Sequence, residues 1–184
     1  VREVVEKALP PLYSDHVYSG EEYQKEGQYE NAIQEYDKAI QIAPDLALAY
    51  SNRGGAYNVL GQYQRAIEDL DKAIQLDPNF LIFYFNRGSS YELLGQYARA
   101  ISDYDKAIQL DPNDAMTYNN RGGVYYALGQ YQRAIEDYTG AIQLDPEDAL
   151  AYYNRGYAYS LLGQDTKAEA AAAKACSLDS LFCR

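Results

Sequence analysis

The chain has 184 residues, 47 % of them hydrophobic and 23 % charged, and its formal net charge is −11. This charge argues against nucleic acid as a partner, because affinity for phosphates comes from clustered Lys and Arg, and the sequence has no basic stripe. No apolar run approaches the roughly 18 residues that would suggest a membrane span, so the chain is expected to be soluble, without direct membrane insertion.

A unit of 34 residues recurs along the chain. A glycine, an alanine and a proline each return at this fixed step: Gly54, Gly88, Gly122 and Gly156; Ala66, Ala100, Ala134 and Ala168; Pro44, Pro78, Pro112 and Pro146. A fixed period of this size is typical of a stacked repeat architecture, in which no single unit can bury its own apolar face.

Each unit is predicted to form a helical hairpin. In residues 47–80, small and apolar residues recur at helical spacing in two runs, over 50–60 and over 63–74, and each run indicates an amphipathic helix. Gly61 breaks the pattern between the runs, and Asp77-Pro78-Asn79 ends the second one and caps the next.

The period and the pattern resemble the tetratricopeptide repeat. The signature of that family appears here as Tyr50-x2-Arg53-Gly54-x2-Tyr57, Ala66-x3-Leu70 and Pro78. Tyr replaces the Trp of the family, and Arg replaces its Leu in four repeats, so the match is a variant of the consensus. The resemblance covers nearly the whole chain, and it implies an all-α, right-handed superhelical solenoid of antiparallel helix hairpins.

The array is expected to be a single domain over residues 1–184. Residues 1–12 are interpreted as a partial helix of a preceding repeat, and the repeats that follow are 13–46, 47–80, 81–114, 115–148 and 149–182. In the last repeat, large apolar residues of the second helix are lost. Because a terminal repeat must offer a more polar outer face, this repeat is predicted to be the C-terminal cap.

The four arginines that replace Leu need partners, because an unpaired charge near a packed interface is costly. Pairing within a repeat would leave Arg155 facing Ala171, whereas pairing with the preceding repeat matches every arginine. The predicted pairs are Arg53–Glu35, Arg87–Asp69, Arg121–Asp103 and Arg155–Asp137.

By the pattern of the family, the first helices line a concave groove, and the sixth residue of each repeat faces inward. This residue is asparagine in four repeats, which resembles the asparagine ladder of the O-GlcNAc transferase repeats. An amide can bond both the N–H and the C=O of an extended peptide; the alternative, of equal weight, is that these amides only bond neighbouring repeats. They are Asn52, Asn86, Asn120 and Asn154.

Apolar and aromatic groove positions complete the predicted peptide site. The second positions form an apolar row: Leu48, Ile82, Met116 and Leu150. Four aromatic residues project from groove positions without a framework role, as binding anchors do: Phe85, Tyr126, Tyr153 and Tyr157. Glu92 is the one charged side chain placed in the groove of the last four repeats, so a neutral or mildly apolar peptide is expected. The Lys and Asn pattern that holds acidic chaperone tails is missing.

Three other features have structural interpretations beside functional ones. His16 stands where later repeats have Tyr, so it is expected to fill an aromatic slot. The run Phe80–Phe85 is either local packing or a self-association patch. Cys176 and Cys183 lie about 10 Å apart along a continuous helix, too far for a disulfide unless the tail frays, and their redox state stays open.

These features favour a protein–protein interaction scaffold that binds a peptide or partner protein in its groove. Alternatives are homo-oligomerisation through Phe80–Phe85 or the array ends, and a repeat segment of a larger enzyme. No catalytic, metal or cofactor motif is found, and an enzyme is not expected. The cytoplasm is slightly favoured as compartment, although the sequence begins at Val1 rather than Met and is expected to be a processed or partial chain. The partner and its pathway cannot be named from the sequence.

Overall fold

A computed structural model describes residues 12–183, which form helices and short turns without a strand. The expected all-α hairpin architecture is confirmed over these residues, and the interpretation of residues 1–11 as a partial helix lies outside them. The chain divides into two compact units, Val1–Pro78 and Asn79–Arg184, and each is described by itself.

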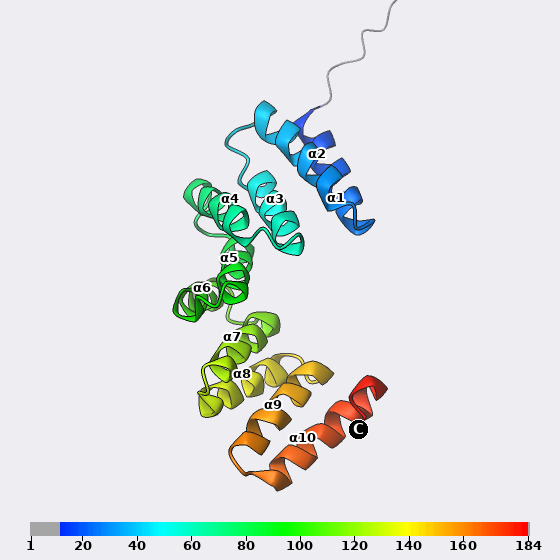
Figure 1. The fold of residues 1–184 in the computed structure, drawn as a ribbon, viewed down its shortest axis with the longest axis vertical. Helices are drawn as coiled ribbons and strands as arrows, with labels where there is room; N and C mark the ends of the chain where they lie inside the picture. Colours follow the sequence, from blue (N-terminus) through cyan, green and yellow to red (C-terminus); the bar gives the residue numbers. More distant parts are fainter. Residues whose placement is uncertain (1–11, 184) are drawn as a thin grey trace, which may run out of the picture. The chain divides into compact units, whose positions relative to one another are not determined.

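The first unit contains two helical hairpins (Figure 1). Its helices are α1 (Tyr13–Lys25), α2 (Tyr29–Ile42), α3 (Ala47–Val59) and α4 (Tyr63–Leu76). Each first helix packs against the second helix of its own hairpin, and α3 also packs against α2. Gly61 ends α3 with φ of 72°, and the amide of Gln62 then bonds the carbonyl of Tyr57 at 2.8 Å, because glycine adopts this left-handed conformation without a Cβ clash.

The second unit contains three hairpins. Its helices are α5 (Leu81–Leu93), α6 (Tyr97–Leu110), α7 (Ala115–Ala127), α8 (Tyr131–Leu144), α9 (Ala149–Leu161) and α10 (Asp165–Leu178), followed by the short 3₁₀ helix η1 (Ser180–Phe182). Within the unit, α7 packs on α6 and α9 packs on α8, so the second and the third hairpin of this unit each pack against the one before. Among the first helices, α5 also contacts α7, and α7 also contacts α9.

A glycine of each first helix admits the large residue of the second helix. A Cβ added at Gly122 would lie 2.8 Å from Cε1 of Tyr138, and one at Gly88 would lie 2.9 Å from Cε1 of Tyr104. Such distances lie below van der Waals contact, so these rings pack directly on the helix backbone. The last repeat differs: beside Gly156 the nearest side-chain atom is Cβ of Ala171, at 3.5 Å.

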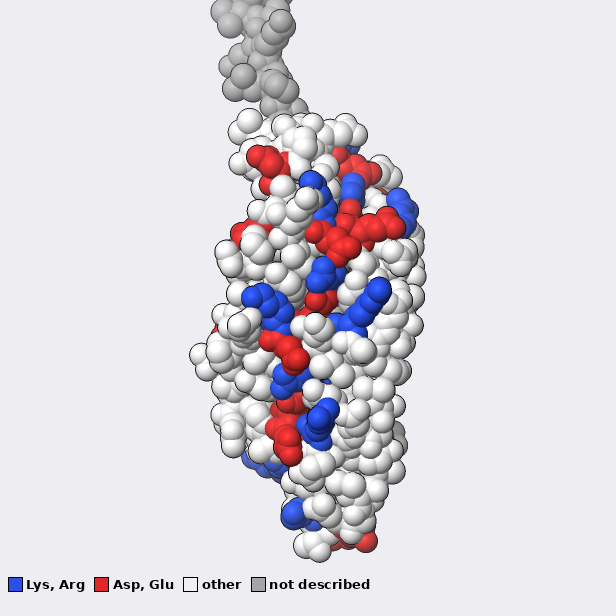
Figure 2. Space-filling model, turned by 90° about the vertical axis from the view of Figure 1, so that its left-hand side faces the viewer, with Lys and Arg blue, Asp and Glu red and all other residues white. Residues whose placement is uncertain are grey.

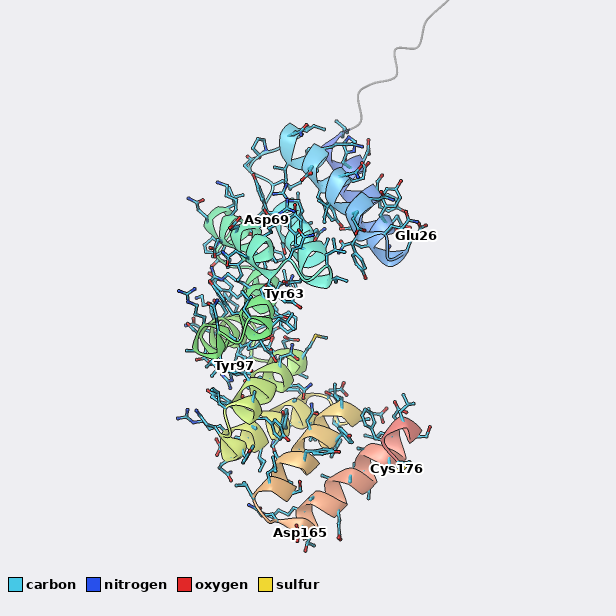
Figure 3. The ribbon with its side chains drawn as sticks, viewed as in Figure 1. Glu26, Tyr63, Asp69, Tyr97, Asp165 and Cys176 are labelled. Carbon is cyan, nitrogen blue, oxygen red and sulfur yellow. A yellow bond between two sulfur atoms is a disulfide. The ribbon has the colours of Figure 1, made fainter. Side chains whose placement is uncertain are left out.

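The predicted arginine pairs are wrong, because the arginines bind other residues of the second helices than those expected. Arg53 binds Asp69 of its own repeat through two parallel hydrogen bonds of 2.8 and 2.6 Å, and reaches Asp37 of the preceding repeat at 2.5 Å. Asp69 is labelled on α4 in Figure 3. Glu35, the expected partner of Arg53, instead accepts a hydrogen bond of 2.6 Å from His16. His16 thus has a hydrogen-bond partner on α2 of its own repeat.

The same pattern holds in the second unit. Arg121 binds Asp137 twice, at 2.8 and 2.6 Å, and Asp105 once, at 2.5 Å, while Arg87 binds Asp103 of its own repeat at 2.8 and 2.7 Å. Bidentate geometry of this kind makes a strong charge-assisted contact. Figure 2 shows basic and acidic side chains alternating over the face that it draws.

The two cysteines form a disulfide, which corrects the expectation drawn from a continuous helix. Helix α10 ends at Leu178, and the turn through η1 brings the Cα atoms of Cys176 and Cys183 to 4.6 Å. Cys176 is labelled near the end of α10 in Figure 3. Phe182, whose docking the sequence left open, packs on Tyr153 with ring centroids 4.8 Å apart.

Candidate functional site

The predicted site residues fall in both units. Leu48 and Asn52 lie on α3 in the first unit, and the other ten lie on α5, α7 and α9 in the second. Ile82, Met116 and Leu150 are exposed, Met116 to 60 %. An apolar row that is exposed on successive first helices has the contact surface that a partner segment requires.

The asparagine amides are held by neighbouring residues. Asn52 donates from Nδ2 to Oε1 of Glu21 at 3.2 Å, and Asn154 donates from Nδ2 to Oδ1 of Asn119 at 3.3 Å. Both contacts reach back to the preceding repeat, as the structural alternative predicted. Such a bond uses one of the two N–H groups of an amide and leaves its carbonyl oxygen as an acceptor.

Half-buried aromatic residues of the groove have packing partners that the sequence did not indicate. Phe85 lies 5.9 Å from the ring of Tyr104, and Tyr126 lies 5.5 Å from the ring of Tyr131. These two residues therefore contribute to the core as well as to the surface. Tyr157 remains 44 % exposed and meets Tyr153 edge to face, at 4.8 Å between centroids.

The run Phe80–Phe85 is divided between core and surface. Phe83 is only 2 % exposed and Tyr84 is buried, whereas Phe80 and Ile82 are exposed. Phe80 stacks on Phe83 with centroids 5.4 Å apart. This division supports local packing as the reason for the run.

Glu92, on α5, lies at the centre of a polar cluster. The hydroxyl of Tyr104, on α6, donates to its Oε2 at 2.8 Å, and Asn120 and Ser89 lie near that hydroxyl. Burial raises the pKa of Glu92 above its ordinary value of 4.5, and the hydrogen bond from Tyr104 offsets only part of this shift. Burial, followed by the negative charge of Glu92, raises the pKa of Tyr104.

A cavity of about 200 Å³ opens between α7, α8 and α9. Its lining joins three predicted residues, Tyr126, Tyr153 and Tyr157, to Asn154 and to Tyr138. Tyr138 is not among the predicted site residues and is only 2 % exposed, yet it forms part of the cavity wall. A core position can line a cavity when the residue in front of it is small or turned away, and the one-dimensional pattern does not record this.

A second cavity, of about 260 Å³, lies beside Gly156. It is lined by Tyr153, Gly156, Tyr157, Ser160, Ala168, Glu169 and Ala172. Ala172 stands where the preceding repeat has Tyr138, so the ring that fills this place over Gly122 is missing here. The loss of Tyr at this position was a visible signal in the sequence, but it was interpreted only as a capping feature.

Helical hairpins stack within each unit, and in the second unit the first helices carry the exposed apolar row and contribute to the cavity. This arrangement defines a helical-repeat scaffold. Family models described as tetratricopeptide repeat match residues 47–80, 82–114, 103–136 and 149–180, and one described as TPR repeat matches 20–59 and 122–163. The chain belongs to the tetratricopeptide repeat family.

Solved structures agree with this assignment. The crystal structure of MamA is 28 % identical, with a TM-score of 0.80, over 88 % of this chain and 94 % of that one. MamA 41-end from Desulfovibrio magneticus RS-1 is 22 % identical, with a TM-score of 0.83, over 96 % and 100 % of the two chains. The first TPR of Spaghetti (RPAP3), bound to the HSP90 peptide SRMEEVD, is 27 % identical, with a TM-score of 0.62, over 64 % of this chain and 93 % of its own. Among curated proteins, none matches this sequence.

The fold is therefore that of a protein-interaction scaffold, a class that is generally non-enzymatic. None of the helices within residues 12–183 is long and apolar enough to cross a membrane. Across the same residues, no three His, Cys, Asp or Glu side chains gather as metal ligands would.

Proposed function

We propose that the chain binds an extended segment of a partner protein along the face formed by α5, α7 and α9. The observation that carries this proposal is the cavity of about 200 Å³, because residues of two successive repeats line it and the exposed apolar row lies on the first helices of the same unit. A cavity of this size lies below the roughly 300–1,000 Å³ of small-molecule pockets and suits one side chain. The RPAP3 repeats, which have this fold, bind a peptide.

In this proposal the residues have different tasks. Ile82, Met116 and Leu150 provide apolar contact, while Tyr153 and Tyr157 select a side chain. The amide of Asn154 is tethered to Asn119 and holds a defined orientation, so its remaining hydrogen-bonding groups can meet the backbone of an extended segment, and we propose the same task for Asn120. Leu48 and Asn52 have the same repeat positions on the first unit, and we propose the same tasks for them.

A display selection tests this function. A library of random 12-residue peptides is selected on the immobilised chain, and the dissociation constant of each retained peptide is measured by calorimetry. Replacing Ile82, Met116 and Leu150 together by Ser should weaken binding about tenfold or more, equal to ~1.4 kcal/mol. These side chains are exposed, so folding should not change.

The matched control replaces Leu128 and Leu144, which are exposed apolar residues outside the predicted groove positions, by Ser. This control should leave each dissociation constant within about twofold, since it removes no groove contact. If both variants retain the same peptides with equal affinity, the face of α5, α7 and α9 is not the binding surface. Sedimentation that depends on concentration, with no peptide retained, would favour homo-oligomerisation instead.

A further inference from the structure

The cavity between α7, α8 and α9 has walls made almost wholly of phenol rings. Tyr126, Tyr138, Tyr153 and Tyr157 line it together with Asn154. The buried ring of Tyr138 closes the inner end, and the exposed ring of Tyr157 stands at the mouth. The negative faces of aromatic rings attract a cation that is placed within about 6 Å of the centroid.

Contacts with the rest of the second unit hold these walls in place. Tyr126 packs against Tyr131, and Tyr153 packs against both Tyr157 and Phe182. The hydroxyl of Tyr153 also donates to that of Tyr157 at 3.2 Å. A preformed site of this kind loses less conformational entropy when a ligand enters.

A carboxylate lies near the inner end of the cavity. Burial raises the pKa of Tyr138, and the charges of the Glu92 and Asp137 carboxylates raise it further, so the inner end of the cavity lies within the electrostatic reach of Glu92. Oε1 of Glu92 lies 3.9 Å from the place where a Cβ would stand on Gly123, one helical turn before Tyr126 on α7. The lining itself contains no Lys or Arg.

Elsewhere in this chain, a combination of tyrosine rings and a nearby carboxylate holds a cation. The guanidinium carbon of Arg121 lies 5.6 Å from the ring centroid of Tyr118 and 6.0 Å from that of Tyr125, and Asp137 binds its nitrogen atoms. Tyr152 and Tyr159 flank Arg155 at 5.2 and 5.9 Å in the same way. Tyrosine rings around a cation are thus a recurring element of this fold.

We propose that the cavity takes the side chain of a lysine or arginine from the bound partner segment, with Tyr126, Tyr153 and Tyr157 around the cation and Glu92 as the balancing charge. This inference rests on the proposed function, because the basic side chain belongs to the segment that lies along α5, α7 and α9. It replaces the expectation of a wholly neutral peptide with a requirement for one basic residue.

Nuclear magnetic resonance on the full chain with ¹³C-labelled tyrosine tests the proposal. The probes are N-acetyl-lysine methylamide and N-acetyl-arginine methylamide, with N-acetyl-norleucine methylamide as the neutral control. The basic probes should shift the ring signals of the four cavity tyrosines in a saturable way, and norleucine should not. Added salt should weaken the shifts, because screening reduces the attraction of Glu92 for a cation.

Two variants locate the interaction. Glu92→Gln keeps the shape of the side chain and should weaken the basic probes about threefold or more, since it removes the nearby charge. Tyr157→Leu should weaken them similarly by removing one ring. Tyr18→Leu, at an exposed tyrosine of the first unit, is the control and should change nothing. Circular dichroism checks the fold of each variant, and Glu92→Gln decides the question if Tyr157→Leu does not fold.

The outcomes separate the two proposals. Equal shifts with norleucine, or unchanged binding in Glu92→Gln, would overturn the cation site. If the display selection yields groove-dependent peptides without enriched Lys or Arg, the proposed function stands and this inference fails. If the basic probes bind but no peptide is retained, the cavity holds a cation and the proposed function fails.

Discussion

Arg155 shows what Arg53, Arg87 and Arg121 gain from their carboxylate partners. Its Nη1 donates to the hydroxyl of Thr139 at 3.2 Å, and its Nε is buried without a hydrogen-bond partner among the described residues. Ala171 stands where Asp137 serves Arg121 one repeat earlier. A buried donor left without a partner costs roughly 1–3 kcal/mol, because its hydration is lost without replacement.

Replacing Ala171 by Asp should therefore stabilise the chain. The new carboxylate would meet Arg155 as Asp137 meets Arg121, with a net gain of about 1 kcal/mol after the lower helix propensity of Asp is subtracted. Urea unfolding measures the change. Ala170→Asp, at an exposed position of the same helix, is the control and should lose about 0.5 kcal/mol. Equal losses in both variants would contradict this account of Arg155.

Glu92 gives stability a dependence on pH. Its pKa in the folded chain lies above the ordinary 4.5, so between these two values the folded state binds more protons than the unfolded state. Stability then falls as pH rises through the folded pKa. Tyr104 donates a hydrogen bond to the carboxylate, but this does not offset the cost of burial.

Glu92→Gln should consequently raise the free energy of unfolding at pH 7.5, and its advantage over the natural chain should shrink as the pH is lowered to 4.5. Urea unfolding at the two pH values gives the comparison, and Glu147→Gln, at an exposed glutamate, should show neither effect. An advantage that stays constant with pH would mean that the charge of Glu92 is not the cause. A buried charge that costs stability is typical of a functional site.

At the scale of the helix pair, stability depends on how closely the second helix approaches the first. Gly122 admits the ring of Tyr138 directly onto the backbone of α7, whereas Ala172 leaves a cavity over Gly156. The same residue type thus has two roles in neighbouring hairpins. Glycine is required at position 122 because the ring of Tyr138 approaches the helix backbone closely. At position 156 no ring approaches, so glycine is not required there.

Alanine should distinguish the two glycines. Gly122→Ala should lower the free energy of unfolding by about 1–3 kcal/mol, because the added Cβ displaces Tyr138. Gly156→Ala should raise it by up to about 1 kcal/mol, because alanine favours the helix and meets only ordinary contacts. Thermal unfolding of both variants measures the difference. Equal destabilisation would show that the ring over Gly122 does not set the requirement.

For the whole molecule, the period was enough to predict the helical hairpins, because helix spacing and turn glycines are local properties of the sequence. The arginine pairs were not predictable in this way. The second helices carry acidic residues at more than one place, and the direction of the side chain decides which of them the guanidinium meets. Arg53 meets Asp69 and Asp37, and passes Glu35.

The candidate site was predictable in part. The exposed apolar row follows from repeat position, and so do Tyr153 and Tyr157. The contribution of Tyr138 to the cavity depends on packing in three dimensions, and the docking of Phe182 depends on where α10 ends. The disulfide between Cys176 and Cys183 depends on the same helix end, which lay beyond the repeating pattern.

The double anchoring of Arg121 has a consequence for how such a chain can change in length. Arg121 joins Asp137 of its own repeat to Asp105 of the repeat before, so each hairpin carries one half of the next connection. Excision of residues 115–148 would bring Arg155 to face Asp105 in the place of Arg121. Loss of genetic material that removes this one whole period therefore preserves the ion pair at the new junction, whereas loss of another length would break it.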